Sequence, residues 1–294
     1  MVYLEIITID IRYVGEKHNR KFVIPDLLIS IELISRGESS LKSVLDSIRN
    51  QTFKNYEVVC VDSSGNEINK KLLLDYGCKV VEVPKETGHL KARYLSHKES
   101  NGDKSLILDS TRPLKEEALS ILDKHYNKRD MVILREDSLG QGFWVEQARK
   151  LKIVSEMQSK RAINETLAFL LPRFYSSSIL TQAFENIYKN TNIYFDRISY
   201  GEHHLIFEAC RRLSDSVVMS DEILLSHYED NSFLTILKKY YRYGKMQKVL
   251  KNIPESTSKS FFSHVRKGIG LKYRIETLPI SVTRGIPFIV GYLF

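Results

Sequence analysis

Cysteine is scarce in this chain of 294 residues, and the few cysteines are widely spread. Cys60, Cys78 and Cys210 stand far apart, and no two of them form a Cys-x-x-Cys pair. Such spacing offers neither a disulfide framework nor the paired thiolates of a structural zinc site. We therefore expect a protein of a reducing compartment that has no zinc centre.

Targeting segments and long apolar runs are lacking as well. Residues 1–10 contain acidic side chains and alternate in polarity, unlike the apolar core of a signal peptide. The uncharged stretch Gly285–Phe294 has ten residues, whereas a membrane-spanning helix needs about 20. With 43% hydrophobic residues and no internal repeat, the chain has the composition of a globular protein of about two domains.

Positive charge is concentrated near the C-terminus. The net charge is +8, and the region from Phe233 to Phe294 contains 12 Lys and Arg against two acidic residues. This region therefore carries +10, which leaves −2 for the first 232 residues. A basic tail on a nearly neutral body is typical of contact with an anionic membrane surface or a nucleic acid.

The tail also contains apolar segments between its basic residues. The predicted helix Phe233–Val249 mixes tyrosines with Lys and Arg, a pattern that fits nucleic-acid binding or simply a solvated helix face. The segments Phe261–Phe262 and Gly285–Phe294 are flanked by basic residues. Short apolar segments with basic flanks are typical of helices that lie in the membrane interface, and we favour that interpretation over nucleic acid.

The order of the predicted elements indicates an α/β fold. Apolar and alternating runs predict strands at 2–12, 27–34, 56–61, 79–83, 105–108, 131–135 and 216–220, with helices between most of them. The segment Phe174–Leu180 is interpreted as a connector. In open α/β sheets, ligands bind beyond the carboxyl ends of the strands. Asp62 and Asp109 each end a predicted strand and are therefore candidates for ligand contacts.

The stretch from Thr87 to Pro113 contains the most informative of these strand ends. A glycine turn leads into a short helix that carries Arg93, and the strand Ser105–Leu108 then delivers Asp109. A carboxylate at that edge is placed to meet a metal or a phosphate group. The alternative is that Asp109 and its neighbours only cap a helix that opens at Pro113.

This stretch resembles the core of the family 2 glycosyltransferases, which have the GT-A fold. Gly88, Ala92-Arg93-Tyr94, Gly102-Asp103 and Asp109 match the family's Gly, Ala-Arg-Asn, Gly-Asp and the first residue of its Asp-x-Asp motif. Thr111 replaces the second Asp, so one carboxylate of the family's metal site is missing. The resemblance covers roughly Leu28 to Tyr243 and extends to archaeal membrane-associated mannosyltransferases.

The resemblance implies a nucleotide diphosphate sugar as donor and assigns residues to it. Ser35 and Arg36 stand where the family has Tyr-Asn beside the nucleobase, and Asp62 would accept hydrogen bonds from the base. The planar fork of Arg93 suits diphosphate oxygens. The plainer alternatives are an Asx-turn for Asp62 and a solvated helix arginine for Arg93.

The resemblance also implies a metal and a catalytic base. Asp109 would hold Mn²⁺ or Mg²⁺, with His227 as a second ligand, although a hydrogen-bonded structural histidine is an equal alternative. Glu202 and His203 take the place of the family's acidic pair, which includes the base that activates the acceptor hydroxyl. Either side chain can accept a proton if its pKa is tuned, and we favour Glu202. An acid that only caps a helix is the alternative for Glu202.

These observations combine into one expectation and one alternative. We expect a GT-A domain at residues 1–230, a C-terminal helical, membrane-associating extension at 231–294, and an inverting, metal-dependent hexosyltransferase. The expected donor is GDP-mannose, and the expected acceptor is a lipid-linked saccharide or glycolipid at the cytoplasmic face of the cell membrane. The alternative is a catalytically inactive GT-A-like protein whose basic tail binds nucleic acid or a protein partner.

Overall fold

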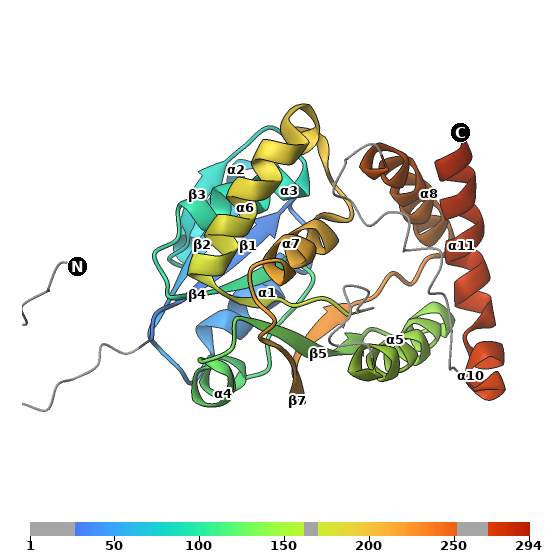
Figure 1. The fold of residues 1–294 in the computed structure, drawn as a ribbon, viewed down its shortest axis with the longest axis horizontal. Helices are drawn as coiled ribbons and strands as arrows, with labels where there is room; N and C mark the ends of the chain where they lie inside the picture. The colour runs from blue at the N-terminus through green and yellow to red at the C-terminus, as the bar shows by residue number, and fades with distance from the viewer. Residues whose placement is uncertain (1–26, 162–169, 252–269) are drawn as a thin grey trace, which may run out of the picture.

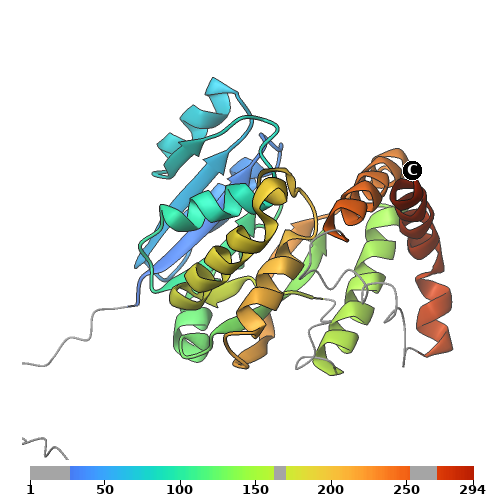
Figure 2. The ribbon, with the colours of Figure 1, turned by 45° about the horizontal axis from the view of Figure 1, so that its top comes forward.

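The computed structural model describes residues 27–161, 170–251 and 270–294 (Figure 1). The predicted strand at 2–12 and the apolar segment Phe261–Phe262 lie outside the described residues. Within them, a central sheet has helices on both faces, and the C-terminal helices lie to one side (Figures 1 and 2).

The described sheet has seven strands in the order β3-β2-β1-β4-β6-β5-β7. All neighbouring strands are parallel except for the two pairings of β6, which are antiparallel. The strands are β1 Ile29–Ser35, β2 Tyr56–Asp62, β3 Lys79–Glu82, β4 Lys104–Asp109, β5 Met131–Leu139, β6 Phe174–Ser176 and β7 Val217–Tyr228.

The parallel register brings the predicted strand ends to one edge. In the pairing of β1 with β2, Ser35 lies opposite Asp62, and in the pairing with β4, Ile34 lies opposite Asp109. All seven residues of β1 are buried, as is typical of a central strand in a parallel sheet that is covered on both faces. The edge formed by these three carboxyl ends is where a ligand is expected in such a sheet.

The interpretation of Phe174–Leu180 as a connector was wrong. Phe174–Ser176 is β6, which lies between β4 and β5, and a helix begins at Ser177. Three residues are too few to show an alternating pattern, so the segment carries no strand signal of its own. It becomes a strand because Phe174 and Tyr175 are fully buried and the backbone pairs on both sides.

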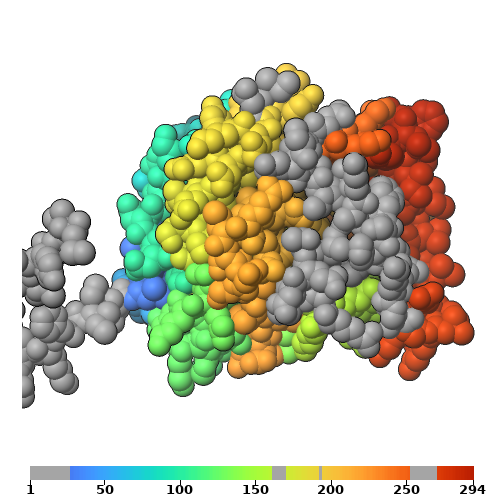
Figure 3. Space-filling view, in the orientation of Figure 1, coloured from blue at the N-terminus to red at the C-terminus, as the bar shows by residue number. Residues whose placement is uncertain are grey.

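Helices cover both faces of the sheet. One core cluster packs α1, α2 and α4 against one face, and a second packs α3, α6 and α7 against the other. In the space-filling view α6 and α7 lie side by side (Figure 3). The bounds are α1 Leu41–Arg49, α2 Glu67–Asp75, α3 His89–Lys98, α4 Ala118–Tyr126, α5 Phe143–Arg161, α6 Ser177–Thr191, the 3-10 helix η1 Asn192–Arg197 and α7 Glu202–Arg211.

The C-terminal helices pack against each other and against α5. They are α8 Phe233–Leu250, α10 Leu271–Glu276 and α11 Leu278–Leu293, drawn from brown-orange to red in Figure 1. A side chain at Gly244 of α8 would collide with the Phe288 carbonyl, and one at Gly291 of α11 would collide with the Tyr241 carbonyl. The two helix backbones therefore touch. No helix among the described residues is both long and apolar enough to cross a bilayer.

Candidate active site

A cavity of about 1040 Å³ opens at the carboxyl edge of the sheet. Its walls come from the ends of β1, β4 and β7, from the start of α7 and from α8. The rings of Tyr200, before α7, and Tyr243, on α8, stack with their centroids 3.8 Å apart. The predicted domain boundary at residue 230 passes through the cavity, since residues before and after position 230 line the cavity.

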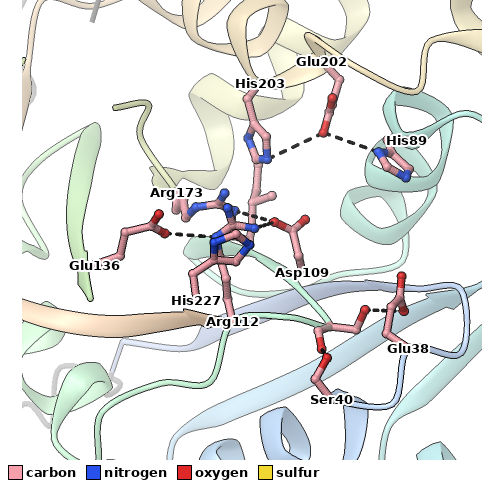
Figure 4. Close-up of polar contacts among 12 residues, drawn as sticks. Glu38, Ser40, His89, Asp109, Arg112, Glu136, Arg173, Glu202, His203 and His227 are labelled. Atoms are coloured by element: carbon pink, nitrogen blue, oxygen red, sulfur yellow. Dashed lines mark hydrogen bonds and ion pairs between the residues drawn. The ribbon is translucent and has the colours of Figure 1, made fainter. Parts of the chain in front are cut away.

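Three arginines donate hydrogen bonds to Asp109 at the end of β4, and two of them, Arg112 and Arg173, are labelled in Figure 4. Arg93 Nη2 donates to Oδ1 of Asp109, and Arg112 Nη1 donates to Oδ2. Arg173 Nη1 also donates to Oδ2, at 3.2 Å. Burial alone would raise the pKa of Asp109, but the three guanidinium groups outweigh it and hold the pKa well below its usual range. Asp109 is therefore ionised and serves as the shared counter-ion of the arginines.

Arg93 connects Asp109 with the start of α7. Its Nε donates to Oε1 of Glu202 at 3.4 Å, and its Nη2 lies 2.9 Å from Nε2 of His203. The side chain is only 1% exposed, and Arg93 is not among the described residues that line the cavity. Enclosed in this way, Arg93 holds Asp109, Glu202 and His203 in place. The diphosphate contact of Arg93 stays a prediction, which this position does not favour.

Glu202 and His203 differ in their capacity to accept a proton. A guanidinium group has only donors, so His203 must accept from Arg93 through Nε2. A neutral His203 then carries its proton on Nδ1, which is buried without a hydrogen-bond partner among the described residues. Burial and the nearby Arg93 and Arg173 lower the pKa of His203 well below its usual value. Both residues line the cavity, and with the ring nitrogens of His203 engaged in this way Glu202 is the better candidate base.

Local backbone geometry places Glu202 at the cavity. Gly201 adopts φ 81°, a left-handed conformation that glycine tolerates far better than other residues. The chain turns there and α7 starts at Glu202, whose acidic side chain is favoured at a helix N-terminus. His89 Nδ1 and His203 Nε2 lie 3.9 Å and 3.7 Å from Oε1 of Glu202 (Figure 4).

A second group of charged residues lies beside Asp109. Arg112 Nε donates to Oε2 of Glu136 at 3.0 Å, and Lys152 Nζ lies 3.2 Å from Glu136 Oε1 and 2.7 Å from Glu229 Oε1. His227 Nδ1 lies 2.9 Å from the same Glu229 oxygen. Burial would raise the pKa of Glu136, but Arg112 and Lys152 hold it well below its usual range. Burial would also raise the pKa of Glu229, but the hydrogen bond with His227 and the charge of Lys152 lower it, so both glutamates are anionic.

The residues around Asp109 do not fit a divalent ion. Within the described residues, no group of three or more His, Cys, Asp or Glu side chains could hold a metal. Both oxygens of Asp109 accept hydrogen bonds from guanidinium groups, whose positive charge would repel a second cation. His227 is hydrogen-bonded to Glu229 and has no contact with Asp109. The assignment of Asp109 and His227 to a metal stays a prediction, which this arrangement does not favour.

The predicted nucleobase end of the site is only partly open to the cavity. Ser35 and Arg36 line it, and Arg36 Nη2 donates to the Thr87 carbonyl at 3.2 Å. Asp62 is 3% exposed and is not among the described lining residues. Its carboxylate accepts from the Ser64 amide at 3.1 Å, as in an Asx-turn, and from Asn69 Nδ2 at 2.9 Å. The contact of Asp62 with a base stays a prediction.

Sequence reasoning missed the residues that surround Asp109. Arg112 stands three positions after Asp109, and this short spacing is the one signal that could have linked the two. Arg173 follows Asp109 by 64 positions, and Lys152 and Glu136 belong to other elements. No local pattern marks these three, because only the order of the strands brings them together.

Comparisons with known proteins agree with this architecture. Residues 33–169, a little under half of the chain, match the model of the family Glycosyl transferase family 2. The match includes Arg93 and Asp109 and ends before Arg173 and Glu202. No curated protein matches the sequence.

Two solved structures of TarS show the same fold. Residues 1–349 of S. aureus TarS align with a TM-score of 0.50 at 18% identity, covering 90% of this chain and 81% of TarS 1–349. The complex of TarS 1–349 with UDP-GlcNAc aligns over the same shares with a TM-score of 0.52 at 16% identity. Glucosyl-3-phosphoglycerate synthase from Mycobacterium tuberculosis aligns with a TM-score of 0.48 at 19% identity, over 78% of this chain and 82% of that one. The TarS alignments, with the mostly parallel sheet, confirm the predicted α/β fold of the GT-A type.

Proposed function

We propose that the chain is an inverting glycosyltransferase that takes its sugar from a nucleotide diphosphate donor. The observation that carries the proposal is Glu202, a carboxylate that faces a cavity of about 1040 Å³ across from Arg112 and Arg173. A base and a cationic wall on one cavity are what a transfer with a diphosphate leaving group requires. The family 2 domain at 33–169 and the likeness to TarS in fold support the same class of reaction.

The residues of this chain supply the chemistry in one displacement. The acceptor oxygen forms a bond to the anomeric carbon as the bond from that carbon to the diphosphate oxygen breaks. The acceptor proton passes to Glu202, and the departing nucleoside diphosphate keeps the bonding electron pair. Arg93 holds the Glu202 carboxylate in place from behind, at 3.4 Å. Attack opposite to the leaving group inverts the configuration at the anomeric carbon.

The proposed donor follows from the sequence resemblance, and the proposed acceptor follows from the C-terminal helices. Mannose from GDP-mannose is the hexose that the sequence resemblance suggests. TarS has been solved with UDP-GlcNAc, which supports a nucleotide sugar as the general class of donor. The proposed acceptor is a lipid-linked saccharide or a glycolipid, because the C-terminal helices carry exposed apolar and basic side chains.

The α10–α11 stripe is the proposed membrane-contacting surface. It consists of exposed apolar side chains spaced three or four residues apart: Leu271, Ile275, Leu278, Val282, Ile286, Ile289 and Leu293. The opposite side of α11, with Ile280 and Phe288, is buried. Lys272 and Arg274 lie exposed within α10. An apolar stripe beside exposed basic residues suits the surface of an anionic bilayer, which we place at the cytoplasmic face of the cell membrane.

Donor turnover by paired variants tests the proposal. Release of nucleoside diphosphate from GDP-mannose, UDP-GlcNAc and UDP-glucose is measured for the full chain with anionic vesicles that contain a glycolipid acceptor. Glu202→Gln should lower kcat by about 10²–10⁴, the usual effect of losing a general base, and leave the donor Kd unchanged. His203→Asn serves as the comparison, because a loss confined to this variant would move the base to His203. Nucleotide binding without turnover of any donor would favour the catalytically inactive binding protein.

A further inference from the structure

We infer that Arg112 and Arg173 bind the donor diphosphate directly, in the place where a divalent metal ion would otherwise stand. The inference rests on the proposed function, because it names how the same cavity holds its donor. It also explains how a site with Thr111 in place of a second carboxylate can neutralise a diphosphate.

The geometry supplies two guanidinium groups at the right edge of the sheet. Arg112 follows β4 and Arg173 precedes β6, so both reach the cavity next to Asp109 (Figure 4). Their side chains are 16% and 12% exposed, in contrast to the 1% of Arg93. Nη2 of Arg112 and both Nε and Nη2 of Arg173 have no hydrogen-bond partner among the described residues. These donors form the planar forks that suit phosphate oxygens.

The charge balance of the cavity favours an anion of this size. Among the described residues that line it, eight are Lys or Arg and six are Asp or Glu. The lining therefore has an excess of two positive charges, with Asp109, Glu136 and Glu229 already counted. A nucleotide diphosphate sugar brings one negative charge on each of its two phosphates. The bound donor would bring the lining to neutrality without an added cation.

Of the two arginines, Arg173 is less compensated by carboxylates than Arg112. Burial and the neighbouring Arg112 lower the pKa of the Arg173 guanidinium to about 10, although Asp109 and Glu136 act in the opposite direction. By contrast, Glu136 and Asp109 outweigh burial and raise the pKa of Arg112 above its usual value. A cation held close to another cation, with only one shared carboxylate contact, gains most from an incoming phosphate.

The test measures binding without metal. UDP, GDP and inorganic pyrophosphate are titrated into the full chain by calorimetry, once with excess EDTA and once with Mn²⁺. We expect at least one of the nucleotides to bind in EDTA, with a Kd within about threefold of its value in Mn²⁺. Arg173→Gln should weaken that binding by about tenfold or more, the usual effect of losing a charge-assisted hydrogen bond. Arg173→Lys should give an intermediate Kd, because it keeps the charge and loses the fork.

Controls separate binding from folding. Arg149→Gln removes an arginine that is 34% exposed and is not among the described lining residues, so the Kd of this variant should equal that of the wild type. Arg173→Gln should melt no lower than the wild type, because it removes the less compensated of the two cations. A melting temperature that falls together with binding would show that Arg173 is structural and would overturn the inference.

The outcomes also separate the inference from the proposed function. Nucleotide binding that requires Mn²⁺ and disappears in EDTA would refute the inference and leave the glycosyltransferase proposal standing. The metal role predicted for Asp109 and His227 would then gain support. Binding in EDTA without transfer of sugar from any donor would support the inference and count against the proposed function. Absence of binding under both conditions would refute the inference.

Discussion

The enclosed position of Arg93 predicts a large loss of stability in Arg93→Met. Methionine keeps much of the apolar volume and removes the charge. Asp109 would still be paired with Arg112 and Arg173, but Glu202 would lose the one arginine with which it forms an ion pair among the described residues. The side chain of Glu202 is 7% exposed. His89 and His203 lie near Glu202, but burial lowers the pKa of both imidazoles, so neither supplies a positive charge at pH 7.

The expected magnitude follows from the burial of Glu202. Removing one partner of a buried ion pair costs about 3–5 kcal/mol, because the remaining charge is left uncompensated. For a chain of this size, each kcal/mol lowers the melting temperature by about 2–4 °C. We therefore expect Arg93→Met to melt about 10 °C below the wild type, as measured by calorimetry together with urea unfolding.

A double-mutant cycle identifies the source of the loss. If the cost comes from the unpaired Glu202, adding Glu202→Gln to Arg93→Met should recover about 1–3 kcal/mol relative to additivity. Arg36→Met is the matched control, since Arg36 is exposed and forms no ion pair within the described residues. An Arg93→Met variant with wild-type stability and lost nucleotide binding would refute this reasoning. It would instead support the diphosphate contact predicted from the sequence.

Three further predictions concern the counter-ion, the histidines and the α10–α11 stripe. Asp109→Asn should lower the free energy of unfolding by about 1–3 kcal/mol, since three guanidinium groups lose their shared anion; unchanged urea unfolding would contradict this. Burial lowers the pKa of His204 from 6.5 to about 4. The unfolded chain therefore binds the extra proton first, and stability should fall by up to about 3 kcal/mol as the pH drops from 6.5 to 4. Urea unfolding at several pH values measures this loss, and His204→Gln should reduce it but leave the part that comes from His89 and His203. The double variant Ile275→Ser/Ile286→Ser should reduce sedimentation with anionic liposomes about tenfold or more without lowering the melting temperature, because both side chains are more than half exposed. Ile68→Ser, at an 80% exposed position on α2, is the control, and equal sedimentation of all forms would exclude the stripe as the contact.

Local patterns were enough to predict much of the sheet and the edge at which the site lies. The apolar run before Asp109 and the alternation of strands and helices correspond to β4 and to the parallel part of the sheet. β6 could not be predicted because its three residues become a strand only between two existing neighbours. The surroundings of Asp109 were missed for a related reason. Arg173 reaches Asp109 only through the position of β6 beside β4, and an interaction across 64 residues leaves no local signal.

The contact between the backbones of α8 and α11 makes the two helices one mechanical unit. At Gly244 and Gly291 there is no room for a side chain between the two helices. A displacement of α11 is therefore transmitted directly to α8. On α8, Tyr240 and Tyr243 form part of the cavity wall, and Tyr243 stacks on Tyr200 at the entrance to α7. A surface that binds the outer side of α11 is therefore expected to restrict α8 as well, and with it the width of the cavity. Coupling between two binding sites is reciprocal. If contact of a surface with α11 strengthens donor binding, the donor-loaded protein must therefore bind that surface more tightly than the empty protein does.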